Sequence, residues 1–368
     1  MAVRRLIISD LHFGSGDDLL SAPAALERIE PELAWADELV INGDLLELVF
    51  ATLREAVDAA RPFLALVNRH VARVHYVLGN HDHHLVSLAG DERRFCEVLG
   101  TPPPAPFRVT PAERLLRSLC RDVDVICPYP LCELDGMRIT HGHYIAAHAA
   151  SSSSRLIERL AWSLTGSSSR LGERLSVADY EALIAPLYEL MYEMANLPSG
   201  KRAQQQFERW LGSVVTIARA PQRASRQVVG FARSIAGRGE SHELLEPLDA
   251  PLAQVLGAME TVCDNLDVEP GTVVFGHTHR PIDGAVTPGG RYRIFNSGAW
   301  VWDRRIRNSP SYRQRAWPGT VLRATGGELE LRGLLDDCDE SGLRSMLGIE
   351  PAPRHPRRRP PTLAAAQP

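Results

Sequence analysis

The sequence lacks the features that mark several large classes of protein. No apolar run approaches the ~18–20 residues that a membrane-spanning helix needs. The six cysteines form no CxxC pair, and such irregular spacing is typical of free thiols in a reducing compartment. No helix-turn-helix, zinc-finger or Walker pattern is present, which argues against sequence-specific binding of nucleic acid. A strand pattern begins within four residues of Met1, so we expect no signal peptide and a cytoplasmic location.

Lysine is also nearly missing, because Lys201 is the only one among 41 basic residues. The net charge is −4, which does not indicate a nucleic-acid partner. The 368 residues are 44% hydrophobic and can bury a sizeable core. Cys127 and Cys132 are spaced closely enough to be considered as metal ligands, but we favour buried free thiols for both.

The first part of the chain alternates apolar runs with helical stretches. The runs at 4–10, 38–44 and 74–80 each end in polar residues, and apolar residues recur at helical spacing over 51–70. This alternation predicts a mainly parallel sheet covered by helices. In such sheets the functional side chains follow the carboxyl ends of the strands.

The character of the sequence changes after His143. Few strand signals occur over 146–264, where leucines recur at helical spacing, so we expect a helical insertion there. The insertion divides the core into two parts, 1–145 and 265–335. The last part, 336–368, has few large apolar residues after an acidic start and is predicted to be disordered. Strands are expected to resume at 271–277, 292–298, 319–325 and 328–334.

Part of the insertion is strongly basic. Residues 201–238 carry eight basic residues and one acidic residue, Glu208, among interleaved apolar residues. A basic, apolar-faced helix pair indicates peripheral contact with an anionic membrane, or a grip on a nucleotide. The alternative is an ordinary helical cap with solvated arginines.

Polar residues gather where the predicted strands end. Mixed carboxylate, amide and imidazole ligands suit Mn²⁺, Fe or Zn²⁺ better than Ca²⁺ or Cu⁺. The candidate ligands, named at the end of this paragraph, number seven, which is more than one tetrahedral ion takes. Two ions that share a carboxylate would use all seven. Such a pair clamps a phosphoryl group and generates hydroxide near neutral pH. The candidate ligands are Asp10, His12, Asp44, Asn80, His141, His277 and His279.

The ordered blocks "SDLH", "NGDLLE", "GNHD", "THGH" and "GHTH" resemble the calcineurin-like metallophosphoesterases across residues 8–279. The resemblance implies a four-layer α/β/β/α sandwich with a binuclear centre. It places Asp10, His12 and His279 on the first metal, with Asp44 bridging. It places Asn80, His141 and His277 on the second metal.

The same resemblance implies the groups that act on the substrate. His81 would assist the leaving group, and Asp82 would orient the imidazole of His81. His143 could face either the metals or the phosphate, and we predict a contact with the substrate. His83 and His84 are expected to face water. Glu47 is interpreted either as an acceptor for a ligand histidine or as a carboxylate at a helix N-terminus. For Asn296, in "FNSGAW", we favour a structural role in a tight turn, and a supporting contact to the site is the alternative.

Within the family, "GDLLE", "GHTHRP" and "GAW" resemble the UDP-2,3-diacylglucosamine pyrophosphatases. Those enzymes carry Arg where this chain has His81 and "HGD" where it has "HGH". We therefore predict a binuclear metal-dependent phosphoesterase, with Mn²⁺ the first choice, that cleaves a phosphomonoester, phosphodiester or pyrophosphate by attack of metal-bound hydroxide. The expected substrate is a phosphate ester, and lipid-linked and nucleotide-linked esters are candidates. The alternatives are a non-catalytic metal-binding scaffold and a membrane-surface regulator.

Overall fold

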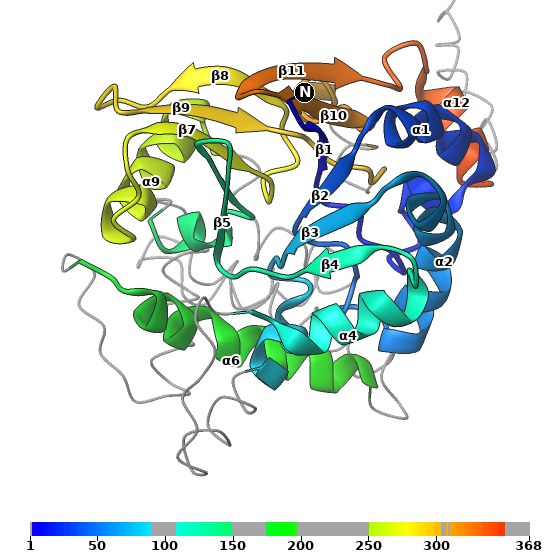
Figure 1. Ribbon diagram of the computed structural model, residues 1–368, viewed down its shortest axis with the longest axis horizontal. Helices are drawn as coiled ribbons and strands as arrows, with labels where there is room; N and C mark the ends of the chain where they lie inside the picture. The colour runs from blue at the N-terminus through cyan, green and yellow to red at the C-terminus, as the bar shows by residue number, and fades with distance from the viewer. Residues whose placement is uncertain are drawn as a thin grey trace, which may run out of the picture.

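The computed structural model describes residues 2–89, 108–148, 174–196, 250–302, 307 and 310–349. The basic segment 201–238 and the residues from 350 onward lie outside this range. Two β-sheets lie face to face, with α1 (Pro23–Trp35) and α2 (Leu53–His70) on one side and α9 (Leu252–Asn265) on the other (Figure 1). The prediction of an α/β/β/α sandwich is confirmed.

The first sheet has a parallel centre extended by two antiparallel strands. β1 pairs in parallel with β2, β2 with β3, and β3 with β4, whereas β10 and β11 run antiparallel. In spatial order the strands are β11 (Glu328–Gly333), β10 (Thr320–Thr325), β1 (Arg4–Ile8), β2 (Glu38–Asn42), β3 (Arg73–Val77) and β4 (Asp124–Ile126).

The second sheet is built from the two parts of the core that flank the insertion. β6, β7 and β9 are parallel, and the edge strands β5 and β8 are antiparallel to their neighbours. The spatial order is β5 (Leu131–Leu134), β6 (Met137–Thr140), β7 (Gly271–Phe275), β9 (Tyr292–Asn296) and β8 (Ile282–Val286). The sequence patterns did not predict β5 or β8.

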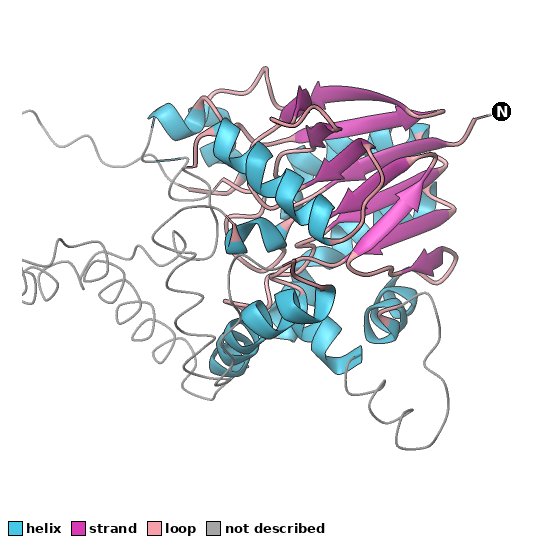
Figure 2. Ribbon diagram, turned by 90° about the vertical axis from the view of Figure 1, so that its left-hand side faces the viewer, coloured by secondary structure: helices cyan, strands magenta, loops and turns pink. Residues whose placement is uncertain are grey.

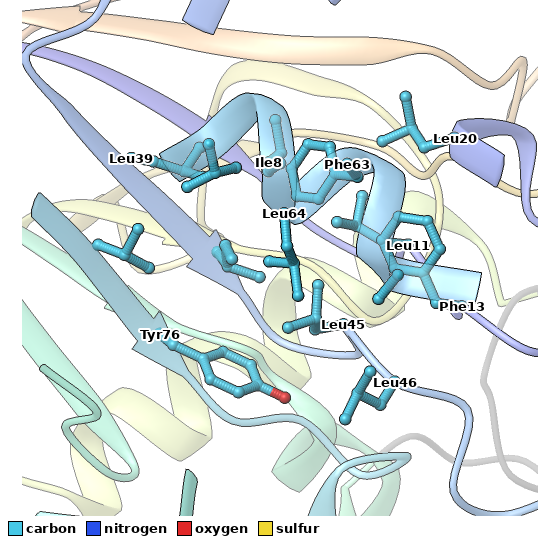
Figure 3. Close-up of a cluster of buried hydrophobic side chains, with 14 of the residues drawn as sticks. Ile8, Leu11, Phe13, Leu20, Leu39, Leu45, Leu46, Phe63, Leu64 and Tyr76 are labelled. Atoms are coloured by element: carbon cyan, nitrogen blue, oxygen red, sulfur yellow. The ribbon is translucent and has the colours of Figure 1, made fainter. Parts of the chain in front are cut away.

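The apolar runs of the strands are buried on both faces, which is why they are continuous rather than alternating. In β1, Leu6 and Ile8 belong to the hydrophobic core that also contains Phe63 of α2. Figure 3 shows Ile8 and Phe63 within this core. Ile7, on the opposite face of the strand, packs against the second sheet at Val274. Figure 2 shows the strands side by side, with helices in front of them and behind them.

Helix α2 begins where the sequence places a reciprocal cap. Thr52 Oγ1 accepts a hydrogen bond from the Glu55 amide, and the Glu55 carboxylate accepts one from the Thr52 amide. Such a capping box satisfies two donors that a helix start leaves open. The remaining helices are η1 (Leu19–Ser21), α4 (Thr110–Leu119), η2 (His143–Ala147), α6 (Val177–Asn196), α11 (Pro310–Arg313) and α12 (Glu340–Met346).

Two predicted boundaries need correction. The predicted insertion 146–264 includes most of α9, yet Val255 and Met259 of α9 pack on Val273 and Phe275 of the second sheet. This helix is therefore a layer of the sandwich. The predicted disordered tail from 336 is also wrong over α12, where Leu343 is fully buried in the first core. One apolar side chain per turn is enough to fix so short a helix when it reaches an existing core. Among the described helices, none is both long and apolar enough to cross a bilayer.

Candidate metal centre

The candidate ligands meet at one edge of the sandwich because five strands end there. Parallel strands of one sheet present their carboxyl ends at the same edge. β1 is followed by Asp10 and His12, β2 by Asp44, β3 by Asn80, β6 by His141, and β7 by His277 and His279. All seven side chains are buried, with at most 3% of their surface exposed.

Asp10, His12 and His279 form a first group. Their ligand atoms lie within 4.8 Å of one another. The Nε2 atoms of His12 and His279 are 3.2 Å apart, and Oδ1 of Asp10 lies 3.3 Å from Nε2 of His279. The first triad predicted from the sequence is therefore brought together by the fold.

Asp44, Asn80, His141 and His277 form a second group. Nε2 of His141 lies 3.1 Å from Oδ2 of Asp44 and 3.0 Å from Oδ1 of Asn80. The same Asn80 oxygen is 2.9 Å from Nδ1 of His277. Oδ2 of Asp44 is also 3.6 Å from Nε2 of His12. The Asp44 carboxylate thus lies between the two groups, as a shared ligand would.

The backbone of these loops is held in a conformation that side chains usually avoid. Asp10, His12, Asp44, His277 and His279 all have φ between 47° and 62°, in the left-handed region. Non-glycine residues occupy this region rarely, and such strain concentrates at functional sites. Backbone contacts hold the loops: the amides of Leu11 and His12 donate to the Asp44 carbonyl.

Two glycines are needed at the centre for space rather than for φ. A Cβ on Gly79 would lie 2.2 Å from Oδ1 of Asp44, and one on Gly276 would lie 2.7 Å from Oδ2 of Asp10. Because neither carboxylate has room to retreat without leaving its group, both positions exclude any side chain.

A single carboxylate, Glu47, contacts two histidines of the centre. Oε2 of Glu47 accepts from Nδ1 of His12 at 3.0 Å, and Oε1 accepts from Nδ1 of His81 at 2.7 Å. Burial alone would raise the pKa of Glu47, but the two imidazoles lower it to about 2. Of the two interpretations of Glu47 from the sequence, the structure supports the acceptor for a ligand histidine.

Asp82 does not have the role that the sequence predicted. Its carboxylate accepts hydrogen bonds from the backbone amides of Leu45 and Leu46 at 3.2 and 2.8 Å, and from the Gly79 amide. Burial, followed by the nearby Asp44 charge, raises the pKa of Asp82 to about 6. Asp82 therefore ties the loop after β2 to the loop after β3, and Glu47 provides the contact that orients His81. Neighbours in sequence point in different directions on such a turn, so adjacency was a poor guide.

His143 is buried beside the second group. Its ring centroid is 5.6 Å from that of His141, and Nε2 lies 3.2 Å from the hydroxyl of Tyr129. Burial and the neighbouring His141 and His277 lower the pKa of His143 well below its usual range.

Asn296 stabilises the loop after β7, which carries two candidate ligands. Its amide nitrogen donates to the Gly276 carbonyl at 2.7 Å and to the Thr278 hydroxyl at 3.1 Å. These contacts fix the loop that carries His277 and His279. Asn296 therefore makes the supporting contact that was the alternative interpretation, and its Oδ1 also accepts from the Gly298 amide at 2.8 Å within the turn.

His83 and His84 are not directed at water as expected. Nε2 of His83 lies 2.6 Å from the Glu181 carboxylate, and Nδ1 of His84 lies 2.9 Å from that of Glu189. Both glutamates belong to α6, which lies along the lower side of the molecule in Figure 1. The ring of His84 also stacks on Tyr192 with 3.4 Å between centroids. The partners are about one hundred residues away in the chain, so no local pattern could reveal them.

The donor set fits divalent metal ions. Nδ1 of His12 donates to Glu47 and Nδ1 of His141 donates to the Asn42 carbonyl at 2.9 Å, which leaves the Nε2 lone pair of each ring for a metal. Burial alone would lower the pKa of His141, but Asp44 raises it to about 9. A cation bound to Asp44 would balance the carboxylate charge in place of the extra proton on His141.

The buried thiols do not take part in this centre. Cys120, Cys127, Cys132 and Cys263 are buried free thiols, as predicted for the pair Cys127 and Cys132. Burial raises the pKa of Cys132 to about 11 and that of Cys127 well above its usual range. Such protonated thiols are poor metal ligands.

The comparisons with known proteins agree with the geometry of the first half of the chain. Residues 3–179 match the family model of calcineurin-like phosphoesterase. The matched residues include the candidate ligands as far as His141, whereas His277 and His279 lie beyond them. No curated protein matches the chain.

Two solved structures align with most of the chain, but with low sequence identity and low TM-scores. One is a mutant cold-active protein tyrosine phosphatase, with 15% identity, 90% of this chain and 80% of the other covered, and a TM-score of 0.28. The other is a dimetal phosphatase from Danio rerio, with 12% identity, 89% and 98% covered, and a TM-score of 0.32. TM-scores this low carry no argument, so the assignment rests on the family match and the centre. Residues 3–179 thus match a calcineurin-like phosphoesterase domain, and this match supports a hydrolase that acts on phosphate esters.

Proposed function

We propose that the two groups hold two divalent metal ions and that the centre hydrolyses a phosphoester by in-line attack. The observation that carries the proposal is the position of Asp44, whose Oδ2 lies 3.1 Å from His141 Nε2 and 3.6 Å from His12 Nε2. Asp10, His12 and His279 would hold one ion, and Asn80, His141 and His277 the other, with Asp44 between them. When bound, such ions polarise a phosphoryl oxygen and lower the pKa of water.

His81 is proposed as the residue that assists the leaving group. Its Nδ1 is engaged by Glu47, so Nε2 is the nitrogen that exchanges a proton with the departing oxygen. Its backbone amide donates to Oδ1 of Asp44 at 2.8 Å, which fixes the distance between the imidazole and the shared carboxylate. Asp82 assists indirectly by holding the loops that carry Asp44 and Asn80.

Three finer assignments belong to this proposal. We propose Mn²⁺ as the preferred metal, because mixed oxygen and nitrogen ligands suit it. His143 is proposed to contact the substrate. The pyrophosphatase-like blocks make a nucleotide-linked lipid one candidate substrate, but His81 and His143 both depart from that pattern, so a simple diester is the first choice for assay.

The test is hydrolysis of bis-p-nitrophenyl phosphate by metal-stripped protein to which Mn²⁺ is returned. Turnover that requires both Mn²⁺ and Asp44, and that disappears in Asp44→Ala, is the expected result. Zn²⁺ and Fe²⁺ are compared in parallel, and p-nitrophenyl phosphate serves as the monoester. Turnover that persists in Asp44→Ala would contradict a centre built around this carboxylate.

A non-catalytic scaffold is separated from an enzyme by His81→Ala. The variant is expected to keep two metal ions, measured by elemental analysis after gel filtration, and to lose most of its turnover. Full metal content with no turnover on any ester in both the wild type and His81→Ala would favour the scaffold.

A further inference from the structure

Glu181 of α6 joins the insertion to three segments beside the metal centre. Its carboxylate accepts from the hydroxyls of Tyr129, at 2.5 Å, and Tyr144, and pairs with His83 at 2.6 Å. These partners come from the segment before β5, from η2, and from the loop after β3. The pairing with His83 holds the pKa of Glu181 below its usual value, although burial alone would raise it. Because three donors surround its carboxylate, Glu181 acts as a hydrogen-bond acceptor.

This acceptor determines the direction of the hydrogen bond between Tyr129 and His143. A tyrosine hydroxyl has one hydrogen, and the hydrogen of Tyr129 is directed to Glu181. Toward Nε2 of His143, 3.2 Å away, the Tyr129 oxygen can therefore only accept. Nε2 of His143 must carry the hydrogen, and in the neutral ring Nδ1 is then a bare lone pair.

Nδ1 of His143 has no hydrogen-bond partner within the described part of the chain, although the residue is only 2% exposed. An acceptor buried without a partner costs about 1–3 kcal/mol. Because the His143 ring lies beside that of His141, a molecule held at the metal centre is the natural source of a donor.

We propose that Glu181 is a positioning residue that acts through Tyr129 to present Nδ1 of His143 as a hydrogen-bond acceptor to the substrate. The proposal rests on the proposed function and deepens it, because it restricts the substrate. Phosphoryl oxygens are anionic acceptors and do not satisfy a lone pair. The ester that suits this centre therefore carries a hydroxyl or N–H donor on its organic part, close to the phosphorus.

The first test reads the tautomer of His143 directly. Long-range ¹H–¹⁵N spectra are recorded on the full chain with ¹⁵N-labelled histidine rings and Zn²⁺ bound, and His143→Gln identifies the signals. The expected result is a neutral ring with hydrogen on Nε2. Hydrogen on Nδ1, or a doubly protonated ring, would overturn the proposal whatever the enzyme hydrolyses.

Two Tyr-to-Phe variants separate positioning from mere anchoring of α6. Tyr129→Phe removes the acceptor for His143 and should allow the Nδ1–H tautomer to appear. Tyr180→Phe is the matched control, because this α6 hydroxyl contacts His148 at 2.6 Å and Asn265 at 2.8 Å instead. It should leave the tautomer of His143 unchanged. The same change of tautomer in both variants would assign Glu181 a purely structural role.

The second test compares two esters that differ only in a donor, 3-hydroxypropyl and butyl p-nitrophenyl phosphate. The wild type is expected to favour the hydroxyl ester in kcat/KM by about 3- to 10-fold, the value of one neutral hydrogen bond. Tyr129→Phe should lose this preference through KM, and Tyr180→Phe should keep it. Equal rates for the two esters in the wild type would refute the restriction on substrate. If neither ester is hydrolysed, the proposed function fails for such diesters, while the tautomer still decides the role of Glu181.

Discussion

Nδ1 of His81 lies 2.7 Å from Oε1 of Glu47, and Oε2 of the same carboxylate accepts a hydrogen bond from Nδ1 of His12. One buried anion therefore orients a proposed metal ligand and the proposed leaving-group residue together. Contacts of this kind fix the tautomer of a ligand and raise its basicity. They therefore contribute strongly to metal affinity and to activity.

Glu47→Gln is expected to lower kcat by about 10- to 100-fold and to weaken metal binding, because the amide can accept from only one of the two histidines. The measurements are kcat on bis-p-nitrophenyl phosphate and metal content after dialysis. Glu32→Gln is the matched control, since Glu32 is a buried carboxylate paired with Arg323 and Arg332 far from the centre. It should cost stability and leave kcat unchanged. Equal losses of kcat in both variants would show that Glu47 has no special role.

Gly79→Ala is expected to abolish turnover and the binding of at least one metal. The new Cβ would lie 2.2 Å from Oδ1 of Asp44, so either the carboxylate or the loop must move. Metal affinity measured by calorimetry gives the effect directly. The control is Gly257→Ala in α9, where the nearest atom is 4.0 Å away and alanine favours the helix by about 1 kcal/mol. A fully active Gly79→Ala enzyme would mean that Asp44 does not need its observed position.

Asn296→Ala is expected to reduce metal affinity by about 10-fold or more, with a smaller change in overall stability. The loop with His277 and His279 loses the donor that holds the Gly276 carbonyl and Thr278. Calorimetric titration with Mn²⁺ provides the affinity. Asn68→Ala, which removes a half-buried amide of α2 that contacts Asp122, should leave the metal affinity unchanged. Unchanged affinity in Asn296→Ala would show that the loop holds its shape unaided.

The His83–Glu181 pair should make stability depend on pH in the alkaline range. Burial alone would lower the pKa of His83, but Glu181 and Glu189 raise it to about 9. The unfolded value is about 6.5, so the pair stabilises fully below that pH and loses its effect as pH rises to about 9. Urea midpoints of the wild type should fall between pH 6.5 and 9, and those of His83→Gln and Glu181→Gln should fall less. Parallel curves for all three proteins would exclude the pair as the cause.

Much of the centre was predictable because the strand-end rule needs only the order of elements. Apolar runs followed by Asp10, Asp44 and Asn80 indicate buried parallel strands, whose carboxyl ends meet at one edge. The geometry that sharpens this prediction is not local. The left-handed φ of His277 and His279 is not encoded by residue type, since histidine favours other conformations.

The sequence by itself determined the buried parallel strands and the free state of Cys127 and Cys132, because apolar patterns within short windows report burial. The order of its motifs, through their resemblance to the metallophosphoesterases, supplied the sandwich and the seven candidate ligands. Only the tertiary structure decided which carboxylate serves His81, where α9 and α12 pack, and that His83 and His143 are tied to Glu181. The His81–Glu47 and His83–Glu181 contacts join residues that are 34 and 98 positions apart. Hydrogen-bond partners at such separations are selected by packing, which no local periodicity reports.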